Sequence, residues 1–270
     1  MNEILIVIVF LAVGYFSGLL IGMFGIGGGL IFVPFLYYFL PILGVPESNL
    51  IYSSIGTSLL SGAVASMNAG YLHLKAKNAD FKTALLIASG SIITAFLTPI
   101  IVIKTQSRIL EIILGIVLLM VSIRMLFEKN ENKKSFISQP LRKEFLVVVG
   151  LLVGVLSAFT GLGGGVVFVP ALIYLFLFEI KRAIGTSSIV TALTMISSSI
   201  SFLILGGINS LSFTSPSYVY LGAAIPLGIG AILGTMFGVK LTLKSSPLVI
   251  KKVFSVILIV AVLRILIKLY

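Results

Sequence analysis

Long hydrophobic stretches separated by short polar connectors fill almost the whole chain. Stretches of roughly 20 apolar residues are long enough to cross a bilayer as a helix, and shorter ones are expected beside glycine-rich loops. This criterion predicts about ten hydrophobic segments, and therefore an all-α polytopic membrane protein. In the first half they cover about 4–23, 29–43, 51–69, 82–103 and 109–127, and in the second half about 145–160, 165–179, 185–206, 217–239 and 249–268.

The two halves of the chain repeat one another. The glycine-rich run at 25–34 returns 136 positions later at 161–170, and Gly56-Thr57-Ser58 returns 129 positions later as Gly185-Thr186-Ser187. The offset changes between segments, as expected when insertions and deletions fall in loops. The sequence therefore predicts a first transmembrane repeat at 1–127, a polar connector at 128–144 and a second transmembrane repeat at 145–270.

Five segments in each half is an odd number, so the second half enters the membrane from the opposite side. This predicts an inverted-topology repeat with glycine-broken helices. The predicted topology places 15 of the 19 lysine and arginine residues on one side of the membrane. Basic residues are enriched in cytoplasmic loops, so we expect the 128–144 connector to be cytoplasmic and both termini extracytoplasmic, in a multi-pass protein of the cell (plasma) membrane.

Composition excludes several classes of protein. With 59% hydrophobic residues, 10% charged residues and a mean hydropathy of +1.22, the chain cannot be a soluble domain. It has no cysteine and one histidine, so the sequence predicts no metal site, no cofactor, no catalytic residue and no enzyme activity. The net charge of +11 lies in the connectors rather than on one amphipathic face, so no nucleic-acid partner is expected.

Three adjacent glycines interrupt an apolar stretch in each half, at Gly27–Gly29 and at Gly163–Gly165. Each glycine disfavours helix by about 1 kcal/mol relative to alanine, so both runs are predicted helix breaks. In the helices that follow, from Leu30 and Val166, the first N–H groups have no partner within the helix and carry the positive end of the helix dipole, which favours a small anion. We expect the two glycine runs, Gly27, Gly28, Gly29 and Gly163, Gly164, Gly165, to bind substrate near the membrane midplane. Close packing alone is the alternative interpretation.

Two hydroxyl pairs follow glycines near the start of the next segment in each half: Thr57 and Ser58, and Thr186 and Ser187. We expect their hydroxyls to provide further hydrogen-bond donors to the substrate. The alternative is that they bond to backbone carbonyls within their own helices, as serine and threonine commonly do in membranes.

Small residues also recur at helical spacing, where they allow two backbones to approach closely. This pattern predicts helix packing rather than chemistry. It occurs at Gly14, Gly18 and Gly22, at Gly150, Gly154 and Ala158, and at Gly230, Gly234 and Gly238. His73 and Asp80 flank a connector that carries Lys75 and Lys77, and we expect both at the membrane interface.

These repeated motifs resemble those of the sulfite exporter TauE/SafE family of membrane permeases, a group that includes sulfonate-uptake permeases. The resemblance covers nearly the whole chain. It comprises the glycine runs at 25–34 and 161–170, the Gly-Thr-Ser motifs, and an apolar-Arg-apolar-Leu motif near the end of each half, at 123–126 and 263–266.

The resemblance implies a secondary transporter for small sulfur-containing anions such as sulfite or organosulfonates, with the two halves enclosing the path by alternating access. The expected partners are a small anionic substrate and the lipid bilayer. The particular anion, the direction, a coupling ion and homo-oligomerisation stay open. The alternatives are a permease for another small anion or for a metal cation, although cation ligands are lacking, and a membrane assembly subunit without transport activity.

Overall fold

The computed structural model describes residues 3–104, 119–120, 122–123, 126–127, 143–206 and 218–269. Within these residues the chain is all-α, and no strand occurs. The elements are α1 (Glu3–Phe24), α2 (Gly29–Phe39), the short 3₁₀ helix η1 (Leu40–Leu43), α3 (Glu47–Lys75), α4 (Phe81–Val102), α6 (Lys143–Thr160), α7 (Gly165–Tyr174), α8 (Ile180–Leu205), α9 (Leu221–Lys244) and α10 (Pro247–Leu269).

The all-α polytopic prediction is confirmed. Each predicted segment corresponds to a helix, except the one at 109–127, which lies largely outside the described residues together with almost all of the 128–144 connector. Within the described residues, six helices are long and apolar enough to cross a membrane, namely those at Ile4–Phe24, Glu47–Lys75, Phe81–Val102, Lys143–Thr160, Ile180–Leu205 and Leu221–Lys244.

The helix α3 is longer than predicted. It extends over 29 residues and begins before the predicted start at 51. The polar residues Ser53, Ser54 and His73 near its ends are fully buried within the protein. A helix with polar side chains can lie at membrane depth when protein rather than lipid surrounds those side chains.

Two helices are too short to span the bilayer. The helix α2 has 11 residues and α7 has 10, and each begins directly after a glycine run. At 1.5 Å per residue they cover roughly half of a hydrocarbon core of about 30 Å. The glycine runs therefore lead into half-helices.

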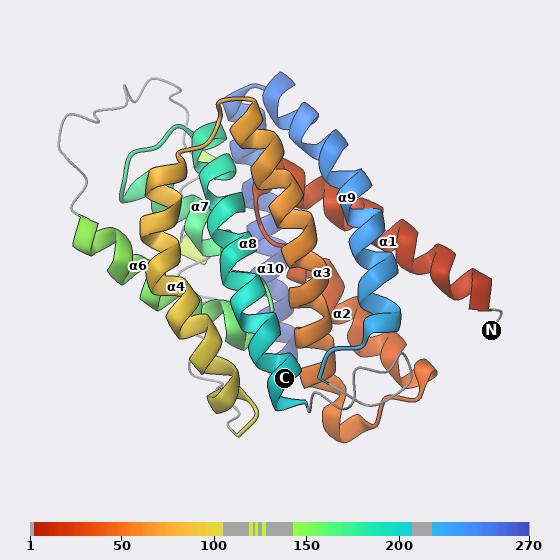
Figure 1. The fold of residues 1–270 in the computed structure, drawn as a ribbon. Helices are drawn as coiled ribbons and strands as arrows, with labels where there is room; N and C mark the ends of the chain where they lie inside the picture. The colour runs from red at the N-terminus through yellow and green to blue at the C-terminus, as the bar shows by residue number, and fades with distance from the viewer. Residues whose placement is uncertain are drawn as a thin grey trace.

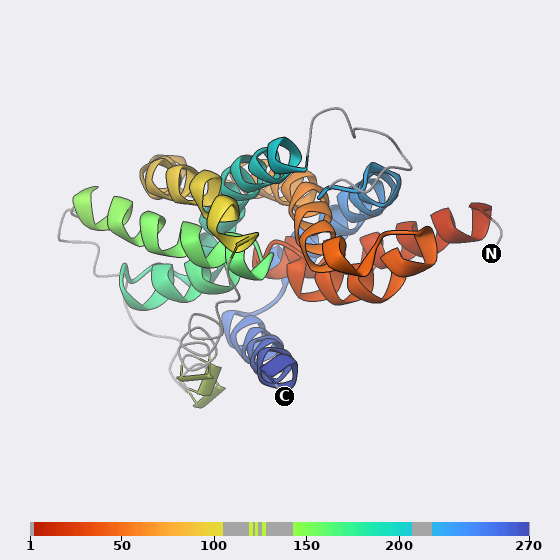
Figure 2. The ribbon, with the colours of Figure 1, turned by 90° about the horizontal axis from the view of Figure 1, so that it is seen from below.

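The helices form two layers that face each other (Figures 1 and 2). The first layer is a row of four helices in the order α4, α8, α3 and α9. The helices α6 and α7 cover one end of this row, and α1 and α2 cover the other. The helix α10 lies outside these two layers. The helices α3 and α8 run antiparallel at the centre of the row.

Small residues bring α1 against α9 and α6 against α4, so the packing predicted for the repeated glycines is confirmed. A Cβ atom added at Gly234 would lie 2.9 Å from the Cα of Gly18, and one at Gly154 would lie 2.6 Å from the carbonyl oxygen of Ser91. Real Cβ atoms do not approach backbone this closely, so no larger residue fits at these contacts.

Two glycines of α9 provide a matched test of this packing. A Cβ at Gly230 would meet the backbone of Leu11 and Tyr15, whereas a Cβ at Gly228 would meet nothing within 4 Å. We expect Gly230→Ala to lower the free energy of unfolding by about 1–3 kcal/mol through overpacking. We expect Gly228→Ala to be neutral or to stabilise by up to about 1 kcal/mol, because alanine favours helix. Thermal unfolding of the purified variants in detergent measures both, and an equal loss from the two substitutions would contradict this account.

Charged residues of the described chain lie at helix ends. Most basic ones gather at the end of the bundle where α3 and α9 finish and where α4, α8 and α10 begin, here called the basic end (Figure 1). Its residues are Lys75, Lys77, Lys82, Lys143, Lys181, Arg182, Lys240, Lys244, Lys251 and Lys252. At the opposite end the described charged residues include Glu47 and Lys104.

Candidate functional site

The two glycine loops, residues 25–28 and 161–164, have almost the same backbone conformation. Three glycines in the first, Gly25, Gly27 and Gly28, have φ angles of +66°, +80° and +80°. The equivalent glycines in the second, Gly161, Gly163 and Gly164, have φ angles of +67°, +78° and +75°. Left-handed backbone of this kind is disfavoured for residues with a side chain, and it turns the chain back after α1 and α6. The predicted helix breaks are therefore present in both halves.

The glycine loops pack directly against each other. A Cβ on Gly29, the first residue of α2, would overlap the carbonyl oxygen of Gly161 and lie 2.6 Å from the Cα of Leu162. A Cβ on Gly165, the first residue of α7, would overlap the carbonyl oxygen of Gly25. The starts of the two half-helices thus meet at the centre of the protein, each resting on the loop before the other.

The serine of each Gly-Thr-Ser motif holds the glycine loop of the opposite half. The Ser58 hydroxyl donates a hydrogen bond to the carbonyl oxygen of Gly161 at 3.4 Å. The Ser187 hydroxyl donates to the carbonyl oxygen of Gly25 at 3.3 Å. The contact thus occurs twice with the halves exchanged, which is the arrangement that an inverted duplication produces.

The threonine of each motif accepts a hydrogen bond from the chain just before a helix of the other half. The Thr57 hydroxyl accepts from the backbone N–H of Tyr220, which precedes α9, at 2.8 Å. The Thr186 hydroxyl accepts from the backbone N–H of Asp80, which precedes α4, at 2.9 Å. The intrahelical alternative does not describe these contacts, because all four hydroxyls bond to the other half. Gly56–Ser58 also lie well inside α3 rather than near its start.

These threonine contacts predict a specific loss of stability. In Thr57→Val the side chain keeps its shape but loses the acceptor for the Tyr220 N–H, and we expect unfolding to become easier by about 1–3 kcal/mol. Ser54→Ala is the matched control, because the buried Ser54 hydroxyl donates to Leu50 of its own helix and has no other partner among the described residues. Thermal unfolding of both variants tests this, and equal losses would show that the contact between the halves contributes nothing of its own.

One side chain occupies the space between the glycine loops, and the two halves differ at its position. Met195 of α8 is completely buried. Its Sδ atom lies 2.6 Å and 3.2 Å from the Cβ positions of Gly163 and Gly27, and 4.0 Å from the Ser66 hydroxyl. The residue 129 positions before Met195 is Ser66, so methionine and serine occupy equivalent places. In the sequence, this difference between the two halves was the only feature that distinguished Met195.

A second residue beside the glycine loops, Thr191, was also missing from the sequence prediction. Its Cγ2 atom lies 3.0 Å from the Cβ position of Gly27. Its hydroxyl is buried and has no hydrogen-bond partner in the part of the chain that the structure describes. Thr191 corresponds to Gly62 at the same offset of 129 positions, so one copy of this position carries a hydroxyl and the other carries none.

Both glycine loops are enclosed, and polar contacts close the basic end. Asp80 forms an ion pair with Arg182 at 2.7 Å, and the Asn78 side chain donates to the carbonyl oxygen of Lys181 at 3.0 Å. His73 is fully buried, with Nε2 3.0 Å from the carbonyl oxygen of Gly22, so its side chain faces the protein interior near the end of α3. Its position in the sequence beside two lysines did not reveal that α1 and α8 cover it.

Aromatic residues close the opposite end. The rings of Tyr52 and Tyr218 lie 5.5 Å apart, centroid to centroid, and Gly56 packs on the carbonyl of Tyr218. The chain before α9 thus covers the part of α3 around Gly56, and the chain before α4 covers the equivalent part of α8 around Gly185. All residues of both glycine loops are buried between these closures.

Comparisons with known proteins agree over nearly the whole chain. The profile of the family described as "Sulfite exporter TauE/SafE" matches residues 10–265. A probable membrane transporter protein of Haemophilus influenzae is 30% identical over 96% of this chain and 97% of its own length. One of Methanocaldococcus jannaschii is 30% identical over 91% and 90% of the two chains, and YunE of Bacillus subtilis is 25% identical over 93% and 94%. No solved structure matches.

Proposed function

The chain is a membrane transporter that belongs to the sulfite exporter TauE/SafE family, and we propose that it carries a small sulfur-containing anion, sulfite or an organosulfonate, held between the two glycine loops. The observation that carries this proposal is the meeting of the two half-helix starts, Gly29 of α2 and Gly165 of α7, at a buried centre. Each start carries the positive end of a helix dipole, so the place where they meet favours a negative charge.

The chemistry around this centre suits an anion rather than a cation. The charged residues that the structure describes lie at helix ends, so no carboxylate lines the glycine loops. Among the described residues no group of three or more His, Asp or Glu side chains is placed to hold a metal ion. Backbone N–H groups and neutral hydroxyls bind oxyanions through hydrogen bonds. Gly27 and Gly163 have no Cβ atoms, so a ligand reaches their backbone when the Met195 side chain, which lies against both, moves aside.

Binding and release require the protein to open. The glycine loops are enclosed, so the substrate enters only when one of the two closures separates. The polar closure joins the chain before α4 to α8, and the aromatic closure joins the chain before α9 to α3. We propose that they open in turn as the two halves rock against each other, which exposes the site to each side of the membrane alternately.

The distribution of basic residues supports an orientation. By the positive-inside rule we infer that the basic end is cytoplasmic and that both termini lie outside, with the protein in the plasma membrane of the cell. The polar closure with Asp80 and Arg182 then faces the cytoplasm, and the aromatic closure with Tyr52 and Tyr218 faces outward.

Transport by purified protein in liposomes tests the function. Parent protein and the double variant Gly28→Val with Gly164→Val are compared for uptake of radiolabelled sulfite and small sulfonates, with sulfate, phosphate and a divalent metal ion as competitors. We expect saturable uptake of sulfite or a sulfonate by the parent and none by the variant. Preference for another ion would reassign the substrate, and no uptake of any ion by folded parent protein would favour an assembly subunit.

Thr191 offers a milder test of the same site. Its Cγ2 atom lies beside Gly27, and its buried hydroxyl has no partner among the described residues, so this hydroxyl is available to donate a hydrogen bond to the anion. Thr191→Val keeps the side-chain shape, and we expect KM for uptake to rise about 10- to 150-fold, since one hydrogen bond to a charged group is worth about 1.5–3 kcal/mol. Because valine replaces a hydroxyl that has no partner in the described part of the chain, stability is expected to hold or improve. An unchanged KM would place the anion away from Thr191.

A further inference from the structure

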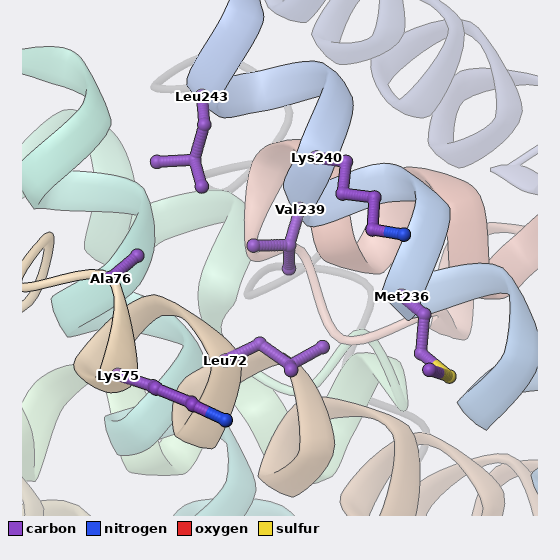
Figure 3. Close-up of a pocket in the computed structure, with 7 residues that line it drawn as sticks. All are labelled: Leu72, Lys75, Ala76, Met236, Val239, Lys240 and Leu243. Carbon is purple, nitrogen blue, oxygen red and sulfur yellow. The ribbon is translucent and has the colours of Figure 1, made fainter.

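A groove at the basic end has the features of a binding site separate from the glycine loops. It lies between the end of α3 and the end of α9 and has a volume of about 230 Å³ (Figure 3). Leu72, Lys75 and Ala76 of α3 line one side, and Met236, Val239, Lys240 and Leu243 of α9 line the other.

The lining combines apolar walls with two positive charges. Lys75 and Lys240 come from different helices and are both exposed. Neither forms an ion pair with any residue that the structure describes. The ammonium group of Lys240 lies 5.7 Å from the centre of the Phe237 ring. Two ammonium groups above an apolar floor fit a ligand that is negatively charged at one end and hydrocarbon along the rest.

The surface that continues from the groove toward the membrane centre is apolar and exposed. Met67, Tyr71 and Leu74 of α3 and Leu233 and Phe237 of α9 are all at least 40% exposed. Exposed apolar side chains on membrane-spanning helices contact lipid chains. A hydrocarbon tail bound at the two lysines therefore has exposed apolar side chains of both helices to lie against.

The opposite end of the protein shows that the fold does not require these lysines. Thr57 and Thr186 make the same contact in the two halves and lie 129 positions apart, and the residue 129 positions after Lys75 is Ile204. Asp80 and Tyr220, their partners, lie 140 positions apart, and the residue 140 positions before Lys240 is Ile100. Ile204 is 49% exposed and Ile100 is 40% exposed. The same two places thus carry isoleucine at one end and lysine at the basic end, where anionic lipids of the cytoplasmic leaflet are expected.

From these observations we propose that the groove binds one anionic phospholipid. The headgroup phosphate lies between Lys75 and Lys240, and an acyl chain follows the apolar surface between α3 and α9. A free phosphate ion would make no use of the apolar walls. The site does not depend on which substrate the glycine loops take.

Native mass spectrometry of the purified protein in detergent tests the proposal, with added dioleoylphosphatidylglycerol or dioleoylphosphatidylcholine. The test variant is Lys75→Gln with Lys240→Gln. The matched control is Lys82→Gln with Lys143→Gln, which removes the same charge from exposed positions of the basic end outside the groove. Surface substitutions of this kind change stability little, so all three proteins are expected to fold. Thermal unfolding with each lipid gives a second readout.

We expect the parent and the control to bind phosphatidylglycerol and to unfold at a higher temperature with it than with phosphatidylcholine. The test variant is expected to bind it about thirtyfold more weakly, from the loss of two basic contacts. Equal losses in the test and control variants would show general surface attraction and overturn the proposal. Three other results would also overturn the proposal. These are equal binding of both lipids, displacement of the bound phospholipid by inorganic phosphate alone, and a dimer that the parent and the control form but the test variant does not.

Discussion

Replacing Gly29 with alanine is expected to abolish uptake and to destabilise the protein more than any other single glycine-to-alanine change discussed above. The new Cβ would overlap the carbonyl oxygen of Gly161 and approach the Cα of Leu162. Both are backbone atoms, so no change of side-chain rotamer relieves the overlap, and the two half-helix starts must separate. Overpacking usually costs about 1–3 kcal/mol, and we expect more than about 3 kcal/mol here.

Gly165→Ala is expected to have the same effect, because Gly165 meets the carbonyl of Gly25 in the same way. Gly228→Ala, with open space around the new Cβ, is the control. Thermal unfolding and liposome uptake are measured on the same preparations. Uptake at the parent rate by Gly29→Ala would show that the two half-helix starts do not need to meet, and the proposed anion site would then be wrong.

Met195→Ala is the second substitution with a large expected effect. Met195 is fully buried and fills the space beside Gly27, Gly62 and Gly163, so its truncation leaves a cavity between the glycine loops. Methionine-to-alanine changes in a core cost about 2–5 kcal/mol. Because the cavity adjoins the proposed site, we also expect uptake to shift toward larger sulfonates relative to sulfite.

The control for Met195→Ala is Met236→Ala on α9, which removes the same side chain from a position that is 43% exposed. This variant is expected to change neither stability nor substrate preference appreciably. The ratio of sulfite uptake to uptake of a larger sulfonate is measured for the parent and both variants. This ratio separates a role of Met195 in shaping the anion site from a role in packing the core alone. A loss of stability with an unchanged ratio would mean that Met195 only packs the core and that the anion binds elsewhere.

The glycine positions were predictable because their cause is local. Three adjacent glycines together disfavour helix by about 3 kcal/mol relative to alanine, so the breaks before α2 and α7 followed from the sequence. The spacing of Gly14, Gly18 and Gly22 likewise puts them on one helical face, although only the structure shows that α9 is the partner of that face.

The roles of polar side chains were harder to predict. Thr57 and Ser58 are neighbours in sequence, yet Thr57 bonds to the chain before α9 and Ser58 bonds to the loop before α7. The partner of a hydroxyl depends on which distant backbone lies beside it. For the same reason His73, next to lysines in sequence, is buried against α1. Nothing in the local sequence records such neighbours.

The sequence by itself determined the class, the spans, the duplication and the breaks, because hydrophobic length, repeated spacing and glycine conformation act along a few consecutive residues. The tertiary structure alone decided that the two glycine loops rest on each other, that Met195 lies between them and that Lys75 and Lys240 share one groove. These contacts join residues far apart in the chain, and they form only when helices from both halves pack together and exclude lipid and water from the centre.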